Sequence, residues 1–170
     1  MSLIDDPSMK EIVIDFCNES ATLFDQLEAT LEELETDLLN TIQLEMFGQI
    51  IDRIMGAAKS IGATEIANFC ELGKLIGYKS SQTKDEALLN IVVAVLFDTV
   101  DILRKMIEAL RTGNSAVLKT LSTDAFSSRL RWLSDKFKHI DRASCAIGKA
   151  DEKSRMNQGS IDDLLESLGL

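Results

Sequence analysis

The sequence predicts an all-α protein that folds as an antiparallel helical bundle. The chain has 170 residues but only one proline and nine glycines, and these are the residues that most often break helices. Hydrophobic residues make up 45% of the chain and aromatic residues only 5%, a composition dominated by helix-favouring Leu, Ile, Ala and Met. Apolar positions also recur at helical spacing along much of the chain. Long helices with short connections pack as an antiparallel bundle of about five helices.

The boundaries of the predicted helices follow from helix breakers and apolar spacing. Asp5, Asp6 and Pro7 make a helix start, because short polar side chains cap helices and proline fits their first turn. Gly77 and Gly113 are predicted to end later helices. The predicted ranges are 8–38, 40–61, 63–77, 83–111 and 115–142. The first helix carries the apolar series Ile12, Phe16, Leu23, Leu27, Leu31, Leu34 and Leu38.

The chain is short for two independent domains, so one bundle over residues 1–147 followed by a tail is predicted. The stretch "GKADEKSRMNQGS" begins at residue 148, is polar and has almost no large apolar side chains. It indicates a linker over residues 148–159. Residues 160–170, "SIDDLLESLGL", then form a separate short element.

The charge of the chain limits its partners. A net charge of −10 argues against nucleic acid and anionic membrane, since both attract clusters of Lys and Arg. Another protein is the expected partner, and the sequence leaves homo-oligomerisation open.

Composition also bears on redox chemistry and location. Cys17, Cys70 and Cys145 are widely spaced and include no C-x-x-C pair, so they predict neither a disulfide framework nor a metal site. No signal peptide opens the sequence, and the best apolar run, "LLNIVVAVLF", is about ten residues, too short to span a bilayer. A cytoplasmic protein without a cofactor of its own is expected.

The helix over residues 40–61 has two distinct faces. With 100° per residue, its large apolar side chains fall within roughly 100° of arc and predict a buried face. They are Phe47, Ile50, Ile51, Ile54, Ala58 and Ile61. The opposite face carries Glu45, Gln49, Asp52 and Gly56 at spacings of 4, 3 and 4. Because Gly56 has no side chain, a partner could approach the backbone closely there.

The stretch "DRIMGAAKSIGA", from residue 52, resembles the histidine phosphotransfer (HPt) family, in particular the first domain of CheA-type chemotaxis kinases. The matching positions are Gly56, Ala57, Ala58, Ile61 and Gly62. Asp52 stands where that family has its reactive histidine, and Met55 where it has a lysine. "IVIDFCNESATLFDQLEATLEELETD" and "GATEIANFCELGKLIG" are similar to the first and third helices of such domains, so the resemblance covers about residues 8–110 and implies an HPt-like four-helix core.

What this resemblance implies is a docking surface without phosphohistidine chemistry. A carboxylate lacks the imidazole nucleophile, and the single histidine, His139, lies elsewhere and is interpreted as a surface residue. The expected ligand of an HPt surface is the receiver domain of a response regulator. The docking surface is expected at Asp52, Gly56, Arg53 and Lys59.

The tail gives a second indication of the same partner. Ser160 is a candidate N-cap, and Asp162 and Asp163 lie in the first turn. Ile161, Leu164, Leu165 and Leu168 form one apolar stripe. The stretch resembles the C-terminal CheY-binding peptide of CheZ-type phosphatases and, less closely, the regulator-binding start of FliM-type switch proteins. So short a helix is expected to fold on a partner, the alternative being that it caps its own bundle.

CheZ-type phosphatases use an acid and a glutamine four residues apart on a helix. Glu45 and Gln49 have that spacing on the exposed face. The resemblance implies that Glu45 pairs with a lysine of a CheY-like regulator and that Gln49 orients the attacking water, while the regulator carries the Mg²⁺. The family's acid is usually Asp, so Glu45 is a departure.

Other interpretations remain open at this stage. Glu86 and Asn90 are a competing acid–amide pair that resembles the site of CheC and CheX phosphatases, but their motif has two intervening residues and belongs to another fold. Capping and solvation account for Glu86 without special chemistry. Three functions therefore compete: a CheZ-like phosphatase, a non-catalytic adaptor for the same regulator, and a structural helical protein.

Overall fold

The computed structural model describes residues 6–122, 128, 132 and 133. The chain forms two compact units, Met1–Phe126 and Ser127–Leu170. Within the described residues all regular structure is helical, which confirms the predicted fold class. None of the described helices is long and apolar enough to cross a membrane.

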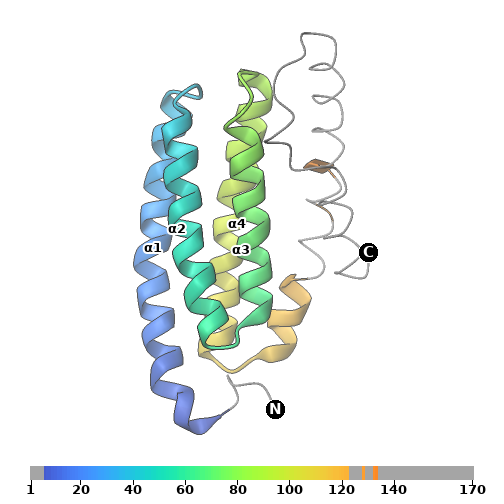
Figure 1. Ribbon diagram of the computed structural model, residues 1–170. Helices are drawn as coiled ribbons and strands as arrows, with labels where there is room; N and C mark the ends of the chain where they lie inside the picture. Colours follow the sequence, from blue (N-terminus) through green and yellow to red (C-terminus); the bar gives the residue numbers. More distant parts are fainter. Residues whose placement is uncertain (1–5, 123–127, 129–131, 134–170) are drawn as a thin grey trace, which may run out of the picture. The chain divides into compact units, whose positions relative to one another are not determined.

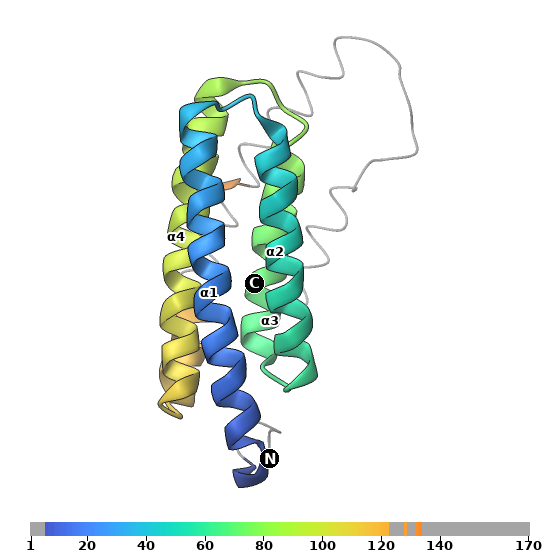
Figure 2. The same cartoon turned by 90° about the vertical axis from the view of Figure 1, so that its left-hand side faces the viewer.

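Four long helices run antiparallel in chain order (Figures 1 and 2). A single 3₁₀ turn, η2 (Pro7–Met9), precedes them, and Asp6 caps it by accepting a hydrogen bond from the backbone N–H of Ser8 at 2.9 Å. The helices are α1 (Lys10–Thr36), α2 (Thr41–Ser60), α3 (Thr64–Ser80) and α4 (Glu86–Arg111). Helix α1 contacts α2 and α4, and α3 contacts the same two helices. The four helices therefore enclose one core, and a further helical stretch follows at residues 115–122.

Two glycines end helices, Gly113 as the sequence predicts and Gly62 in addition. Gly113 follows α4 with φ of 68°, and Gly62 follows α2 with φ of 78°. After α2, the N–H of Gly62 donates to the carbonyl of Lys59 at 3.2 Å and the N–H of Ala63 to that of Ala58 at 2.8 Å. This pattern is a Schellman motif, which satisfies carbonyls at the helix end.

The prediction that the third helix ends at Gly77 is wrong, because α3 continues to Ser80. Gly77 lies inside the helix and is buried; a Cβ built there would lie 3.7 Å from the ring of Phe47 and 3.8 Å from the carbonyl oxygen of Leu44. The residue therefore serves close packing of α3 on α2 rather than helix termination.

The predicted inner face of α2 is confirmed. Phe47, Ile51, Ile54 and Ala58 are fully buried and Ile61 is 4% exposed, whereas Ile50 is only half-buried. From α1 the core receives Phe24, Leu27, Leu31 and Leu34.

Two residues of the apolar series predicted for the first helix are not part of the core. Ile12 is 49% exposed, and Leu38 lies beyond the end of α1 and is only half-buried. The beginning of α1 extends past the ends of its neighbours (Figure 2), and the first side chains of the helix that enter the core are Val13 and Phe16.

Polar contacts join neighbouring helices around the core. Arg104 of α4 donates to Asp25 and Glu28 of α1, each at 2.9 Å, and its guanidinium lies 5.4 Å from the ring centroid of Phe24. Between α1 and α2, the amide of Gln43 donates to Glu33 at 2.7 Å. These contacts link α4 to α1 and α1 to α2 at the edge of the core.

Candidate functional site

The outward face of α2 carries the acid, the amide and the glycine that the sequence singled out. Glu45, Gln49 and Gly56 are exposed, and 43% of the Asp52 side chain is exposed. Their exposure follows from the burial of the isoleucines on the opposite side of the same helix.

A groove runs between this face of α2 and helix α3. Its volume is about 270 Å³, and we call it the α2–α3 groove. Its lining comes from both helices and the turn after α3, and consists of Leu44, Glu45, Gly48, Gln49, Asp52, Lys74, Gly77, Tyr78 and Ser81. The structure thus brings together Glu45, Gln49 and Asp52, and it adds groups from α3 that sequence reasoning did not identify.

The most important addition is Lys74. Its ammonium lies 2.9 Å from a carboxylate oxygen of Asp52, and 47% of the Lys74 side chain is exposed. Lys74 was missed because its partner lies on another helix. The signal that could have found it is the run "GKLIG", in which two glycines four residues apart mark the side of α3 that approaches a neighbour.

The glycines around the groove differ in what they do. A Cβ at Gly73 would lie 3.4 Å from the methyl group of Thr99 and 3.8 Å from Ile51, so Gly73, like Gly77, sits where helices pack closely. A Cβ at Gly48 or Gly56 would meet nothing within 4 Å among the described residues. Packing inside the described bundle therefore does not require glycine at either position, although glycine weakens a helix.

The two groups proposed for chemistry are free to act. Among the described residues, neither the Gln49 amide nor the Glu45 carboxylate has a hydrogen-bond or ion-pair partner. An exposed amide without an internal partner retains both donor hydrogens and an acceptor oxygen for a ligand or a water molecule.

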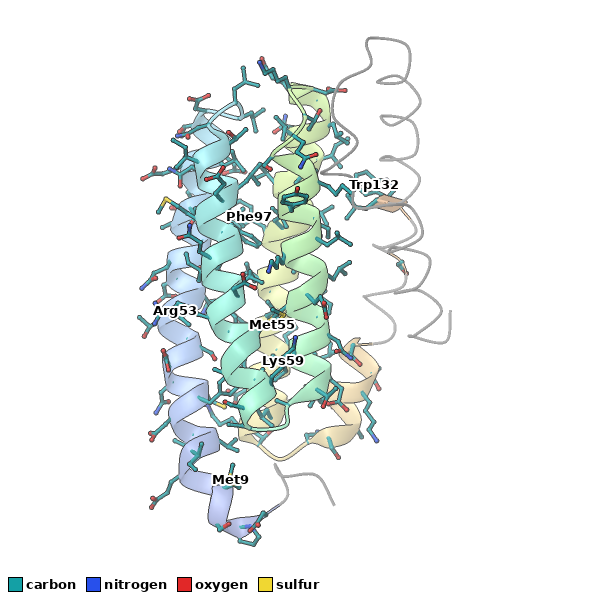
Figure 3. All side chains as sticks on the ribbon, in the orientation of Figure 1. Met9, Arg53, Met55, Lys59, Phe97 and Trp132 are labelled. Carbon is teal, nitrogen blue, oxygen red and sulfur yellow. The ribbon has the colours of Figure 1, made fainter. Side chains whose placement is uncertain are left out.

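Three residues of the predicted docking surface, Arg53, Gly56 and Lys59, do not line the groove. Arg53 pairs with Glu19 of α1 at 3.2 Å, and Figure 3 shows it on the side of α2 towards α1. Lys59 is exposed in the last turn of α2. Met55, which stands where the HPt pattern has a lysine, is half-buried on the side towards α3 (Figure 3). Gly56 is exposed beyond the end of the groove lining.

A cysteine lies behind the groove but does not belong to its chemistry. Cys70 of α3 is fully buried. Burial, reinforced by the negative charge of Asp52, raises the pKa of the Cys70 thiol from 9.0 to about 12. A thiol in that state is an inert packing group, because the thiolate is the reactive form.

The competing acid–amide pair is better explained by helix capping. Asp85 caps α4 by accepting from the N–H of Leu88 at 3.1 Å, and Glu86 lies in the first turn, where the helix dipole favours an acid. Glu86 and Asn90 are both exposed.

A second cavity, of about 330 Å³, lies at the end of α4 and includes Glu108 and Asn114 in its lining. Glu108 pairs with Arg111 at 3.6 Å, and Asn114 accepts from the N–H of Val117 at 3.2 Å. Since both groups already have structural partners, the α2–α3 groove is the better candidate site. In the described part of the chain, no three His, Cys, Asp or Glu side chains gather as metal ligands do.

Several sequence predictions lie outside the described residues. They concern His139, the boundaries of the linker over 148–159, and the tail residues Ile161, Asp162, Asp163, Leu164, Leu165 and Leu168. They remain predictions.

Comparison of the chain with protein-family models, with curated proteins and with solved structures found no match. Functional conclusions for this chain therefore depend on the geometry of the α2–α3 groove and on the residue patterns of the sequence.

Proposed function

We propose that this protein binds the receiver domain of a CheY-like response regulator in the cytoplasm and promotes hydrolysis of the receiver's aspartyl phosphate. The observation that carries the proposal is the placement of Gln49 and Glu45, without internal partners among the described residues, in one open groove. The residue pattern that resembles HPt and CheZ-type proteins supplies the partner.

The reaction requires little chemistry from this chain. Water attacks phosphorus while the bond from phosphorus to the aspartyl oxygen breaks, which releases inorganic phosphate and a free carboxylate; the protons of the water pass to the phosphate. The receiver's Mg²⁺ neutralises charge on the phosphoryl group. The amide of Gln49 accepts a hydrogen bond from the water and holds it in line, so its contribution is positioning.

Glu45 is placed to bind the partner rather than to react. It is an exposed acid without an ion-pair partner in the described bundle, one helical turn from Gln49. A lysine at the edge of the receiver's phosphorylation site would complement it, and a pair of opposite charges fixes the register of docking.

The ion pair between Lys74 and Asp52 reduces the repulsion that a phosphoryl group would meet in the groove. An uncompensated carboxylate about 5 Å from a phosphoryl group would oppose binding by about 3 kcal/mol at the effective dielectric of a protein surface. Lys74 lies 2.9 Å from Asp52 and compensates its charge. The groove can therefore accept an anionic group despite two acids in its lining.

A non-catalytic adaptor for the same receiver is the second candidate. It is favoured by the ion pair with Lys74 that engages Asp52 at the position of the HPt histidine. The groove would then bind the regulator without changing its phosphate.

The two functions are separated by measuring phosphate release and binding together. A CheY-type receiver is phosphorylated with a small-molecule phosphodonor, the donor is removed, and free phosphate is followed with and without this protein. Release faster than the receiver's own rate is expected for the phosphatase. If the protein binds the receiver but the rate of phosphate release stays that of the receiver alone, the protein is an adaptor. If it does not bind the receiver, both proposals are contradicted.

A further inference from the structure

Lys74 gives the groove a property that Gln49 and Glu45 do not provide. Among the described residues that line it, Lys74 is the only basic one. It lies on α3, opposite the α2 wall that carries Gln49, so a group bound in the groove lies between an amide and an ammonium.

The contact with Asp52 leaves the ammonium able to bind a ligand. An ammonium has three hydrogen-bond donors, and the described structure uses one of them in the 2.9 Å contact with Asp52. Because nearly half of the Lys74 side chain is exposed, its remaining donors can reach a group that enters the groove.

We propose that Lys74 makes the groove selective for the phosphorylated state of its partner by donating a hydrogen bond to a phosphoryl oxygen. This inference rests on the proposed function, because it assumes that a receiver docks at the α2–α3 groove. It adds the residue that distinguishes the phosphorylated partner from the unphosphorylated one. Gln49 cannot do so by charge, since its amide is neutral.

Asp52 has the opposite effect on this selectivity. It orients Lys74, but half-exposed ion pairs contribute little to orientation, whereas its negative charge repels a phosphoryl group at close range. The repulsion is the larger effect. Asp52 therefore limits the affinity for the phosphorylated partner and favours release of the phosphate once it has formed.

The test compares the affinity of the full-length protein for two forms of one CheY-type receiver. One form carries Mg²⁺ alone, and the other carries Mg²⁺ and beryllofluoride, a stable analogue of the phosphoryl group. The selectivity ratio is the dissociation constant for the form with Mg²⁺ alone divided by that for the beryllofluoride form. It does not depend on whether hydrolysis occurs. Thermal unfolding of every variant establishes that the fold is retained.

Lys74→Gln is expected to reduce the ratio by roughly tenfold, the value of one charge-assisted hydrogen bond, with little change for the unphosphorylated receiver. Asp52→Asn is expected to raise the ratio severalfold, and Lys74→Arg to retain most of it. The matched control is Lys105→Gln, which removes the same charge from an exposed lysine on α4 and should leave the ratio unchanged.

Two results would overturn the inference in distinguishable ways. If the unaltered protein binds neither form of the receiver, the proposed function fails and the inference fails with it. If it prefers the beryllofluoride form and Lys74→Gln keeps that preference, receiver docking stands but the role of Lys74 is wrong.

Discussion

The ammonium of Lys74 lies 2.9 Å from the carboxylate of Asp52 across the α2–α3 groove. This contact places opposite charges at the position where the HPt pattern has its histidine. Because both side chains are nearly half exposed, an ion pair of this kind contributes at most about 1 kcal/mol to folding. Its larger effect is on the charge that a docked partner meets.

The two faces of α2 predict opposite outcomes for one kind of substitution. Ile54 is fully buried, whereas 63% of Ile42 on the same helix is exposed. Ile54→Asp should prevent folding, because it buries a charge without a partner. Ile42→Asp should leave the protein folded and change the free energy of unfolding by less than about 1 kcal/mol. Circular dichroism during heating distinguishes them, and equal melting of the two variants would show that the faces are assigned wrongly.

Gly48 should be replaceable by alanine with a gain in stability. A Cβ there meets nothing within 4 Å among the described residues, so Gly48→Ala is expected to stabilise α2 by about 0.5–1 kcal/mol. It should also weaken receiver binding, because the methyl group enters the groove. Gly113→Ala, at a residue with φ of 68°, is expected to destabilise the protein instead. Urea unfolding checks both signs, and a destabilised Gly48→Ala variant would mean that α2 needs glycine there for its own packing.

The sequence was sufficient to predict the elements whose signals are local. The period of the buried side chains on α2 predicted its inner face, and helix-ending glycines predicted the end of α4. It failed at Gly77, because a glycine that allows two helices to approach has the same local appearance as one that ends a helix. Likewise, no local pattern reveals that Lys74 meets Asp52, since that contact depends on how α2 and α3 pack.

Alkaline pH should destabilise the protein through Cys70. Its pKa is raised from 9.0 to about 12 in the folded state, so between these values the unfolded chain loses a proton that the folded chain keeps. Stability contributed by this thiol is therefore present below pH 9 and decreases as pH rises towards 12. From pH 8 to pH 10 the free energy of unfolding should fall by about 1 kcal/mol more in the unaltered protein than in Cys70→Ala. Parallel pH profiles of the two proteins would contradict this assignment.

Removing residues 160–170 should separate recruitment from folding. In the unit Met1–Phe126 the described core lies within residues 13–118, so the truncated protein is expected to melt like the full chain. If the tail tethers the receiver, its loss lowers the local concentration of the receiver at the groove. The dissociation constant should then rise by about tenfold or more, as is typical when one of two linked binding contacts is lost. Titration calorimetry with a CheY-type receiver measures this, and an unchanged dissociation constant would remove the tail from the proposal.

The central claim is that Gln49 positions water against a docked phosphoryl group, and phosphate release by Gln49→Ala tests it most directly. The unaltered protein should accelerate loss of phosphate from a phosphorylated CheY-type receiver. Gln49→Ala should return the rate to that of the receiver alone while the dissociation constant changes by less than about twofold, because the amide acts mainly in the transition state. Gln26→Ala, at an exposed glutamine on α1, should remain as active as the unaltered protein. Hydrolysis that persists at full rate in Gln49→Ala, or a wild-type rate no faster than the receiver's own, would contradict the claim.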